Sequence, residues 1–208
     1  MGALNAIDGL ILGVMIYSGF SHWIAGLRSD TLRDHLYFGL LTLFFTGYTY
    51  FNMVGSDATS AESFFVSCRW EVNLGYIGLI PYALFIQHYT KTKLSLIAKS
   101  VLVLCLVTVI LNNVLNLPIL FNAYSSEPYT MEWSGGASYT VEGTMAWRLV
   151  ADIAVLSLMF ISFRAVWLQF KRGNRNDALV LGVALLVFWF GMLWDNFSEF
   201  GNVYTVNV

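Results

Sequence analysis

The chain has 208 residues, of which 57% are hydrophobic and 12% are charged. With a mean hydropathy of +0.64 and long apolar runs, it carries more apolar side chains than the core of a soluble domain of this size can bury, which excludes an ordinary soluble protein. The formal net charge of −2 says little by itself, because in a membrane protein the distribution of charge along the chain matters more than its sum.

Six apolar runs are long enough to cross, as helices, the roughly 30 Å of hydrocarbon in a bilayer. We therefore expect an all-α fold, a polytopic membrane helical bundle of six transmembrane helices, with residues 1–208 forming a single domain. The predicted helices are Ile7–Leu27, Leu36–Val54, Phe64–Tyr89, Leu94–Val114, Met145–Leu168 and Ala178–Phe200. The first run has no Lys or Arg before it and no cleavage pattern after it, which indicates a retained helix rather than a signal peptide.

Gly9 and Gly13 form a GxxxG motif within the first predicted helix. Small residues at this spacing let the backbone of a neighbouring helix approach closely. The motif is common in membrane helices and does not by itself identify the neighbour.

Basic residues predict the orientation of the bundle. They follow the first, third and fifth predicted helices, at Arg28, Arg33, Lys91, Lys93, Lys99, Lys171, Arg172 and Arg175. The alternate connections, residues 55–63 and 115–144, contain acidic residues and no Lys or Arg. Because cytoplasmic loops carry the excess of Lys and Arg, the N-terminus is expected outside and the three basic loops inside.

Residues 115–144 are predicted to form an extracytoplasmic loop. Within it, Tyr129–Gly143 contains two short alternating runs on either side of Gly135 and Gly136, a pattern typical of a β-hairpin. Such a hairpin would cover the outer end of the bundle, whereas an ordinary surface loop is the alternative.

Three predicted helices place charged side chains at a similar depth near the outer face. Ionisable groups that face lipid there cost a few kcal/mol each, so they are expected to face the bundle interior. The candidate ligand-binding residues are Arg69, Glu71, Asn73, Arg148, Asp152, Asp195 and Glu199. We expect Arg69 to meet a carboxylate on another helix, either Asp152 or Asp195. The alternatives to a ligand pocket are a structural ion-pair network and side chains that sit at the membrane interface.

The three histidines, His22, His35 and His88, fall near the cytoplasmic ends of predicted helices. Imidazoles on neighbouring helices are natural metal and haem ligands. No carboxylate or Cys partner has a diagnostic spacing, so the metal and cofactor expectation is none, and a haem or metal protein is kept only as a third hypothesis.

Three stretches resemble a known family. They are "RSDTLRDHLYFGLLTLFFTGYTYF", "ESFFVSCRWEVNLGYIGLIPYALFIQHYT" and "FKRGNRNDALVLGVALLVFWFGMLWDNFSEFGNV". They look like the N-terminal seven-transmembrane sensory region of bacterial histidine kinases and diguanylate cyclases, in helix order and loop style. The resemblance implies a multi-pass location in the bacterial cytoplasmic (inner) membrane and a role in signal transduction of the two-component kind. In that family a seventh helix and a cytoplasmic PAS, kinase or GGDEF-type domain follow, and neither occurs in these residues.

The resemblance therefore implies a signal-input domain that detects a small ligand or a membrane state. Its expected partners are the lipid bilayer, a small-molecule ligand and a second copy in a homodimer, with no nucleic acid. No Walker loop, HExxH, CxxC or GxSxG occurs, so no catalytic residue is expected, and any kinase or cyclase activity would lie outside these residues. The alternative is a small six-helix transport or membrane-complex subunit.

Overall fold

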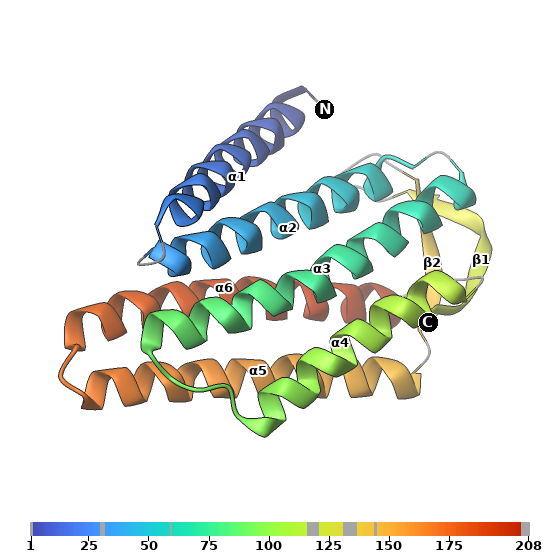
Figure 1. The fold of residues 1–208 in the computed structure, drawn as a ribbon. Coiled ribbons are helices and arrows are strands. Elements are labelled where there is room, and N and C mark those ends of the chain that lie inside the picture. The colour runs from blue at the N-terminus through green and yellow to red at the C-terminus, as the bar shows by residue number, and fades with distance from the viewer. Residues whose placement is uncertain are drawn as a thin grey trace.

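The computed structural model describes residues 2–29, 32–58, 60–115, 121–130, 137–143 and 145–204. These residues form six helices and one two-stranded sheet (Figure 1). The helices are α1 (Gly2–Arg28), α2 (Arg33–Ser56), α3 (Ala61–Thr90), α4 (Leu96–Val114), α5 (Met145–Lys171) and α6 (Arg175–Tyr204). The architecture is thus a helical bundle, and each predicted apolar run coincides with one helix.

The sheet lies between α4 and α5 in the chain. Strands β1 (Phe121–Thr130) and β2 (Ala137–Gly143) pair antiparallel, and β2 contacts α2, α3 and α6. The ladder is irregular between Tyr124 and Pro128, where a proline has no N–H to donate to a partner strand. The strands mark one end of the bundle, which we call the strand end (Figure 1). The opposite end holds the α1–α2, α3–α4 and α5–α6 connections, and we call it the loop end.

Helix α3 occupies the centre of the bundle. It contacts α2 on one side and α4 and α5 on the other, while α1 packs on α2 and α6 packs on α5 (Figure 1). The 30 residues of α3 extend over about 45 Å at 1.5 Å per residue, so this helix reaches both ends of the bundle. Its start is fixed by a capping box between Ser60 and Ser63, and Lys91 ends it in the left-handed conformation.

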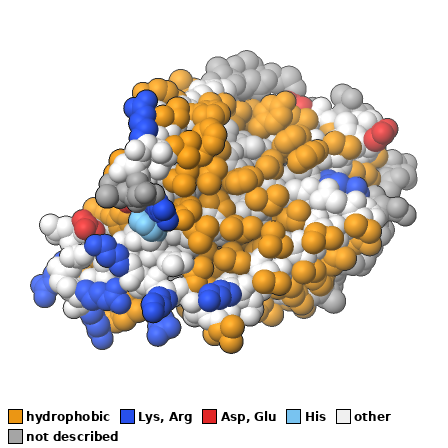
Figure 2. All heavy atoms as spheres, viewed as in Figure 1, with side chains coloured by type: hydrophobic (Ala, Val, Ile, Leu, Met, Phe, Trp, Pro, Cys, Tyr) orange, Lys and Arg blue, Asp and Glu red, His pale blue; other side chains and the backbone are white. Residues whose placement is uncertain are grey.

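Among the described residues, four segments are long and apolar enough to cross a membrane: Gly9–Arg28, Leu96–Val114, Leu149–Lys171 and Arg175–Leu193. Large apolar side chains remain exposed on these helices, and Figure 2 shows hydrophobic side chains over much of the visible face. A soluble protein rarely exposes so continuous an apolar surface. The chain is accordingly a helical membrane protein. Helices α2 and α3 are more polar than the four helices that contain these segments. Polar side chains suit α3, because its neighbours are other helices.

The apolar core lies between α3, α4, α5 and α6. Its buried members are Leu79, Tyr82, Ala83, Ile86, Val101, Cys105, Ala154, Leu158, Ala165, Leu181, Leu185 and Trp189. At the loop end, the Arg172 guanidinium donates to the carbonyls of Thr90 and Lys91, both at 3.3 Å, and so joins the end of α5 to the end of α3. The four helices are therefore held together by packing along their length and by this link at one end.

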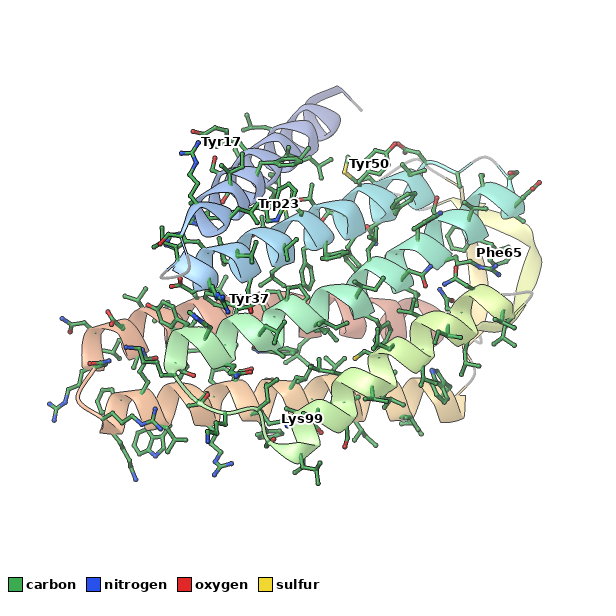
Figure 3. All side chains as sticks on the ribbon, viewed as in Figure 1. Tyr17, Trp23, Tyr37, Tyr50, Phe65 and Lys99 are labelled. Carbon is green, nitrogen blue, oxygen red and sulfur yellow. The ribbon has the colours of Figure 1, made fainter. Side chains whose placement is uncertain are left out.

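Helices α1 and α2 approach each other through glycines. A Cβ added to Gly39 would lie 2.7 Å from the Gly19 carbonyl oxygen and 2.8 Å from the Cα of Trp23, and one added to Gly26 would meet the backbone of Leu36. Trp23 lies at this contact between α1 and α2 (Figure 3). By contrast, a Cβ at Gly9 or Gly13 would meet nothing within 4 Å. In the described residues, the GxxxG motif of the sequence is thus open, and the close backbone contact lies further along α1.

Candidate functional site: the polar side chains around helix α3

The first polar contact of α3 joins it to α2 near the strand end. The Asn52 amide on α2 donates to a Glu71 carboxylate oxygen on α3 at 3.0 Å. Glu71 is half-buried. An acid at this position on α3 therefore faces a neighbouring helix, where the amide supplies a hydrogen bond that lipid would not.

Asn73 lies one turn away from Arg69 on α3 and forms an amide cluster with α4. Asn112 donates to the Asn73 side-chain oxygen at 2.8 Å and to the Arg69 carbonyl at 3.0 Å. Asn73 and Asn113 exchange two further hydrogen bonds, both at 3.1 Å. Asn73 is 4% exposed and Asn112 is 0% exposed, so these amides depend on one another for hydrogen bonding.

Arg69 reaches the C-terminal end of α4. Its guanidinium donates to the carbonyl oxygen of Leu115, the C-cap residue, at 2.9 Å. The last carbonyls of a helix have no partner within the helix and carry partial negative charge, so a cation is stabilised there. One hydrogen bond of Arg69 thus leads to the backbone carbonyl at the C-cap of α4, a partner the sequence did not indicate, and the expected contact with Asp152 or Asp195 stays a prediction.

Three residues of the predicted ligand-binding set take part in the hydrogen bonds described above. Arg69, Glu71 and Asn73 lie in one layer, which we call the outer polar layer and which also includes Asn52, Asn112 and Asn113. Asp152 is half-buried on α5. The side chains of Arg148, Asp195 and Glu199 lie outside the described residues, so the contribution of α6 to this layer stays a prediction.

A second polar group, which sequence reasoning missed, is buried deeper in the bundle. The Trp189 indole N–H of α6 donates to the Tyr82 hydroxyl oxygen of α3 at 3.0 Å, and the Tyr82 O–H donates to the Ser162 hydroxyl of α5 at 2.7 Å. Ser162 in turn donates to the Leu158 carbonyl at 2.6 Å. Tyr82, Ser162 and Trp189 are each 2% exposed. We call this series the Tyr82 chain, and it joins α3 to both α5 and α6.

A small and a large hollow border the described helices. The smaller, of about 20 Å³, borders Tyr82 and Ser162 and has room for about one water molecule. The larger, of about 400 Å³, lies between α1 and the strand end of α2, where Tyr50 projects from α2 (Figure 3). Its lining is Leu12, Tyr50, Met53, Val54, Asp57, Ala58 and Ser63. Only the larger hollow has the volume of a typical small-molecule site.

The structure brings two of the three histidines together and places the third elsewhere. The Nδ1 atoms of His22 on α1 and His35 on α2 are 2.7 Å apart. His88 on α3 instead contacts the ring of Tyr37, with the centroids 6.0 Å apart. Among the described residues no group of three or more His, Cys, Asp and Glu side chains is placed to hold a metal ion. The described arrangement therefore does not bring all three histidines to one site.

No protein-family model, curated protein or solved structure matches this chain.

Proposed function

We propose that the chain is a membrane-embedded signal-input domain, which detects a small ligand or a membrane state and passes the change to a cytoplasmic output domain. The observation that supports this most is the bonding of α3. Side chains join it to α2 through Glu71, to α4 through Arg69 and Asn73, and to α5 and α6 through Tyr82. A central helix bonded to four neighbours can relay a displacement at the strand end to the loop end. The family resemblance of the sequence points to the same role.

The strength of these contacts is compatible with a bundle that changes between two packings of its helices. Hydrogen bonds between membrane helices contribute on average about 0.6 kcal/mol and at most about 1.7 kcal/mol. A shift of two states from 1:99 to 99:1 takes about 5.5 kcal/mol of differential binding, which equals about nine such bonds at the average strength or about three at the maximum. A ligand that replaces some of the hydrogen bonds in the outer polar layer would therefore change which packing of the helices is populated. No catalytic step is assigned to this domain.

Two places are proposed for the stimulus. The outer polar layer supplies both hydrogen-bond donors and acceptors, and the larger hollow supplies apolar walls with Asp57 and Ser63 at its edge. We propose a small amphiphilic ligand or a lipid for the hollow, because α1 is apolar and exposed beside it. A second copy in a homodimer is the further proposed partner.

We also propose six membrane crossings, with the N-terminus outside and the location in the bacterial cytoplasmic membrane. The support is the distribution of charge: basic residues follow α1, α3 and α5, and most of the Lys and Arg side chains visible in Figure 2 gather at the loop end. Cytoplasmic loops carry such an excess. The strand end, which contains Asp57 and Glu62, would then face outward.

This topology predicts opposite labelling of two exposed residues. In intact cells, a cysteine that replaces Asp57 should react with a membrane-impermeant thiol reagent, whereas one that replaces Asn174 should react only after the cells are opened. Both positions are exposed, and the native Cys68 and Cys105 are buried, so the background should be low. Labelling of Asn174→Cys but not Asp57→Cys in intact cells would invert the topology.

The relay itself predicts a long-range effect of Asn112. Spin labels at Lys91 and Asn174, both exposed at the loop end, report the separation of the end of α3 from the α5–α6 turn. Asn112→Leu removes hydrogen bonds to Asn73 and to the Arg69 carbonyl. We expect pulsed electron paramagnetic resonance in lipid nanodiscs to show a changed balance of two distances.

Ser100→Leu is the control for this experiment. It also replaces a polar side chain of α4 with leucine, but Ser100 is exposed and lies outside the outer polar layer. Ser100→Leu should therefore leave the distance distribution close to that of the unaltered chain. If Asn112→Leu leaves it equally unchanged while lowering thermal stability, the layer is structural only and the relay is wrong.

A further inference from the structure

His22 and His35 point their Nδ1 atoms at each other across the α1–α2 contact. The two nitrogens are 2.7 Å apart, the ring centroids are 4.9 Å apart and the ring planes differ by 21°. The separation of the centroids exceeds the separation of the nitrogens by about two ring radii, one for each imidazole. The nitrogens therefore lie close to the line that joins the ring centres, and their lone-pair directions converge on one point.

The surrounding structure holds this pair in place. Gly26 and Gly39 bring the backbones of α1 and α2 together beside it, and the Phe38 ring packs edge-on against His22 with the centroids 4.8 Å apart. Both imidazoles are half-buried, so an ion from the loop end can reach them and still be partly shielded from water. The convergence of the two nitrogens thus depends on helix packing and not on a surface loop.

The hydrogen bond between two imidazoles uses one N–H and one lone pair. When the donor ring carries its proton on Nε2 in place of Nδ1, both rings stay neutral and two Nδ1 lone pairs face each other, and a cation between them relieves the repulsion. A Zn–N bond is about 2.0–2.1 Å long, so two imidazole nitrogens on one tetrahedral ion are roughly 3.3 Å apart. Rotation of the two side chains would open the present separation to that value and aim both nitrogens at an ion beside the line that joins them.

We propose that His22 and His35 form a two-histidine site for a divalent transition-metal ion of the class that prefers imidazole, such as Zn²⁺ or Cu²⁺. Water would fill the remaining positions on the ion. The half-buried Asp34 adds a nearby negative charge, whereas Arg28 and Arg33 add positive charges that limit the affinity. Occupation of the site would hold the loop ends of α1 and α2 together. This proposal does not depend on the sensory function.

Zinc binding to the purified full chain in detergent, carrying no polyhistidine tag, tests the site. Isothermal titration with ZnCl₂ should give one ion per chain. His22→Gln and His35→Gln should each weaken binding by more than about tenfold, since even the loss of a second-shell partner typically costs that much. His88→Gln is the matched control, because His88 contacts Tyr37 instead, and it should bind zinc as the unaltered chain does.

Copper gives a readout that needs no variant. Cu²⁺ bound to the unaltered chain should show electron paramagnetic resonance couplings from two imidazole nitrogens. Couplings from fewer than two, the absence of saturable zinc binding, or an equal loss of affinity in His88→Gln would each overturn the proposal. Melting curves of the three variants without metal identify a variant that has lost its fold, and the copper spectrum of the unaltered chain then decides.

Discussion

Gly39→Ala is expected to force α1 away from α2 and to lower the free energy of unfolding by about 1–3 kcal/mol, the usual cost of overpacking. The added methyl group would overlap the backbone of Trp23 and lie 2.7 Å from the Gly19 carbonyl oxygen. A flexible side chain could rotate out of the way, but these are backbone atoms of a helix. Relief therefore requires movement of α1 as a whole. Thermal or denaturant unfolding in detergent micelles measures the change.

Gly13→Ala is the matched control. It makes the same substitution within a helix of the same pair, but the new Cβ would meet nothing within 4 Å. Because Gly is about 1 kcal/mol less favourable than Ala in a helix interior, this change should leave stability unaltered or raise it. If Gly39→Ala and Gly13→Ala behave alike, the close α1–α2 contact does not exist as described.

The helices themselves could be predicted from the sequence because their apolar runs are long. The fourth helix begins two residues later than predicted, at Leu96 and not at Leu94. The first helix is longer than predicted, Gly2–Arg28 compared with Ile7–Leu27. The differences fall at helix ends, where capping side chains rather than apolar content decide the boundary. Ser95, for example, accepts a hydrogen bond from the Ala98 N–H and so defines where α4 begins.

The neighbours of the polar side chains could not be predicted in the same way. Depth in the membrane follows from position in a run, so the sequence could place Arg69 and Glu71 near one end of their helix. It does not say which helices adjoin or how they are rotated. One partner of Arg69, the Leu115 carbonyl, is a backbone atom without any residue-type signal. The adjacent amides of Asn112 and Asn113 near the end of an apolar run are the one signal that could have pointed to α4.

Glycine spacing could not locate the helix contact for a related reason. Gly9 and Gly13 have the motif, but the motif says only that a close approach is sterically allowed. The approach occurs where two helices offer small residues at the same level, as Gly19 on α1 does opposite Gly39 on α2. That pairing depends on the register of two helices, which no single run reveals. The Tyr82 chain could not be predicted for the same reason, because Ser162 and Trp189 lie 80 and 107 residues from Tyr82 in the sequence.

Tyr82→Phe should destabilise the bundle by about 1–3 kcal/mol, the cost of leaving a buried donor without its acceptor. The change keeps the ring and its stacking on Phe188, with centroids 5.5 Å apart, and removes only the hydroxyl. The Trp189 N–H then loses the oxygen to which it donates, at a site that is 2% exposed. A water molecule in the adjoining hollow of about 20 Å³ would bring the loss towards the lower figure. Unfolding in detergent micelles gives the free-energy change.

Two comparisons separate this hydrogen-bond effect from general damage. Tyr17→Phe removes the same hydroxyl from a side chain that is 77% exposed, and it should change stability by no more than about 0.5 kcal/mol. Ser162→Ala removes the group that accepts from Tyr82, so combining it with Tyr82→Phe should give a coupling energy of about 0.6 kcal/mol, with about 1.7 kcal/mol as the upper bound for bonds between membrane helices. Additive losses in the double variant would mean that Tyr82 and Ser162 do not share a hydrogen bond. The link from α3 to α5 would then rest on apolar packing and on the Arg172 hydrogen bonds at the loop end, and a relay through α3 would run through α4 or through Trp189 of α6.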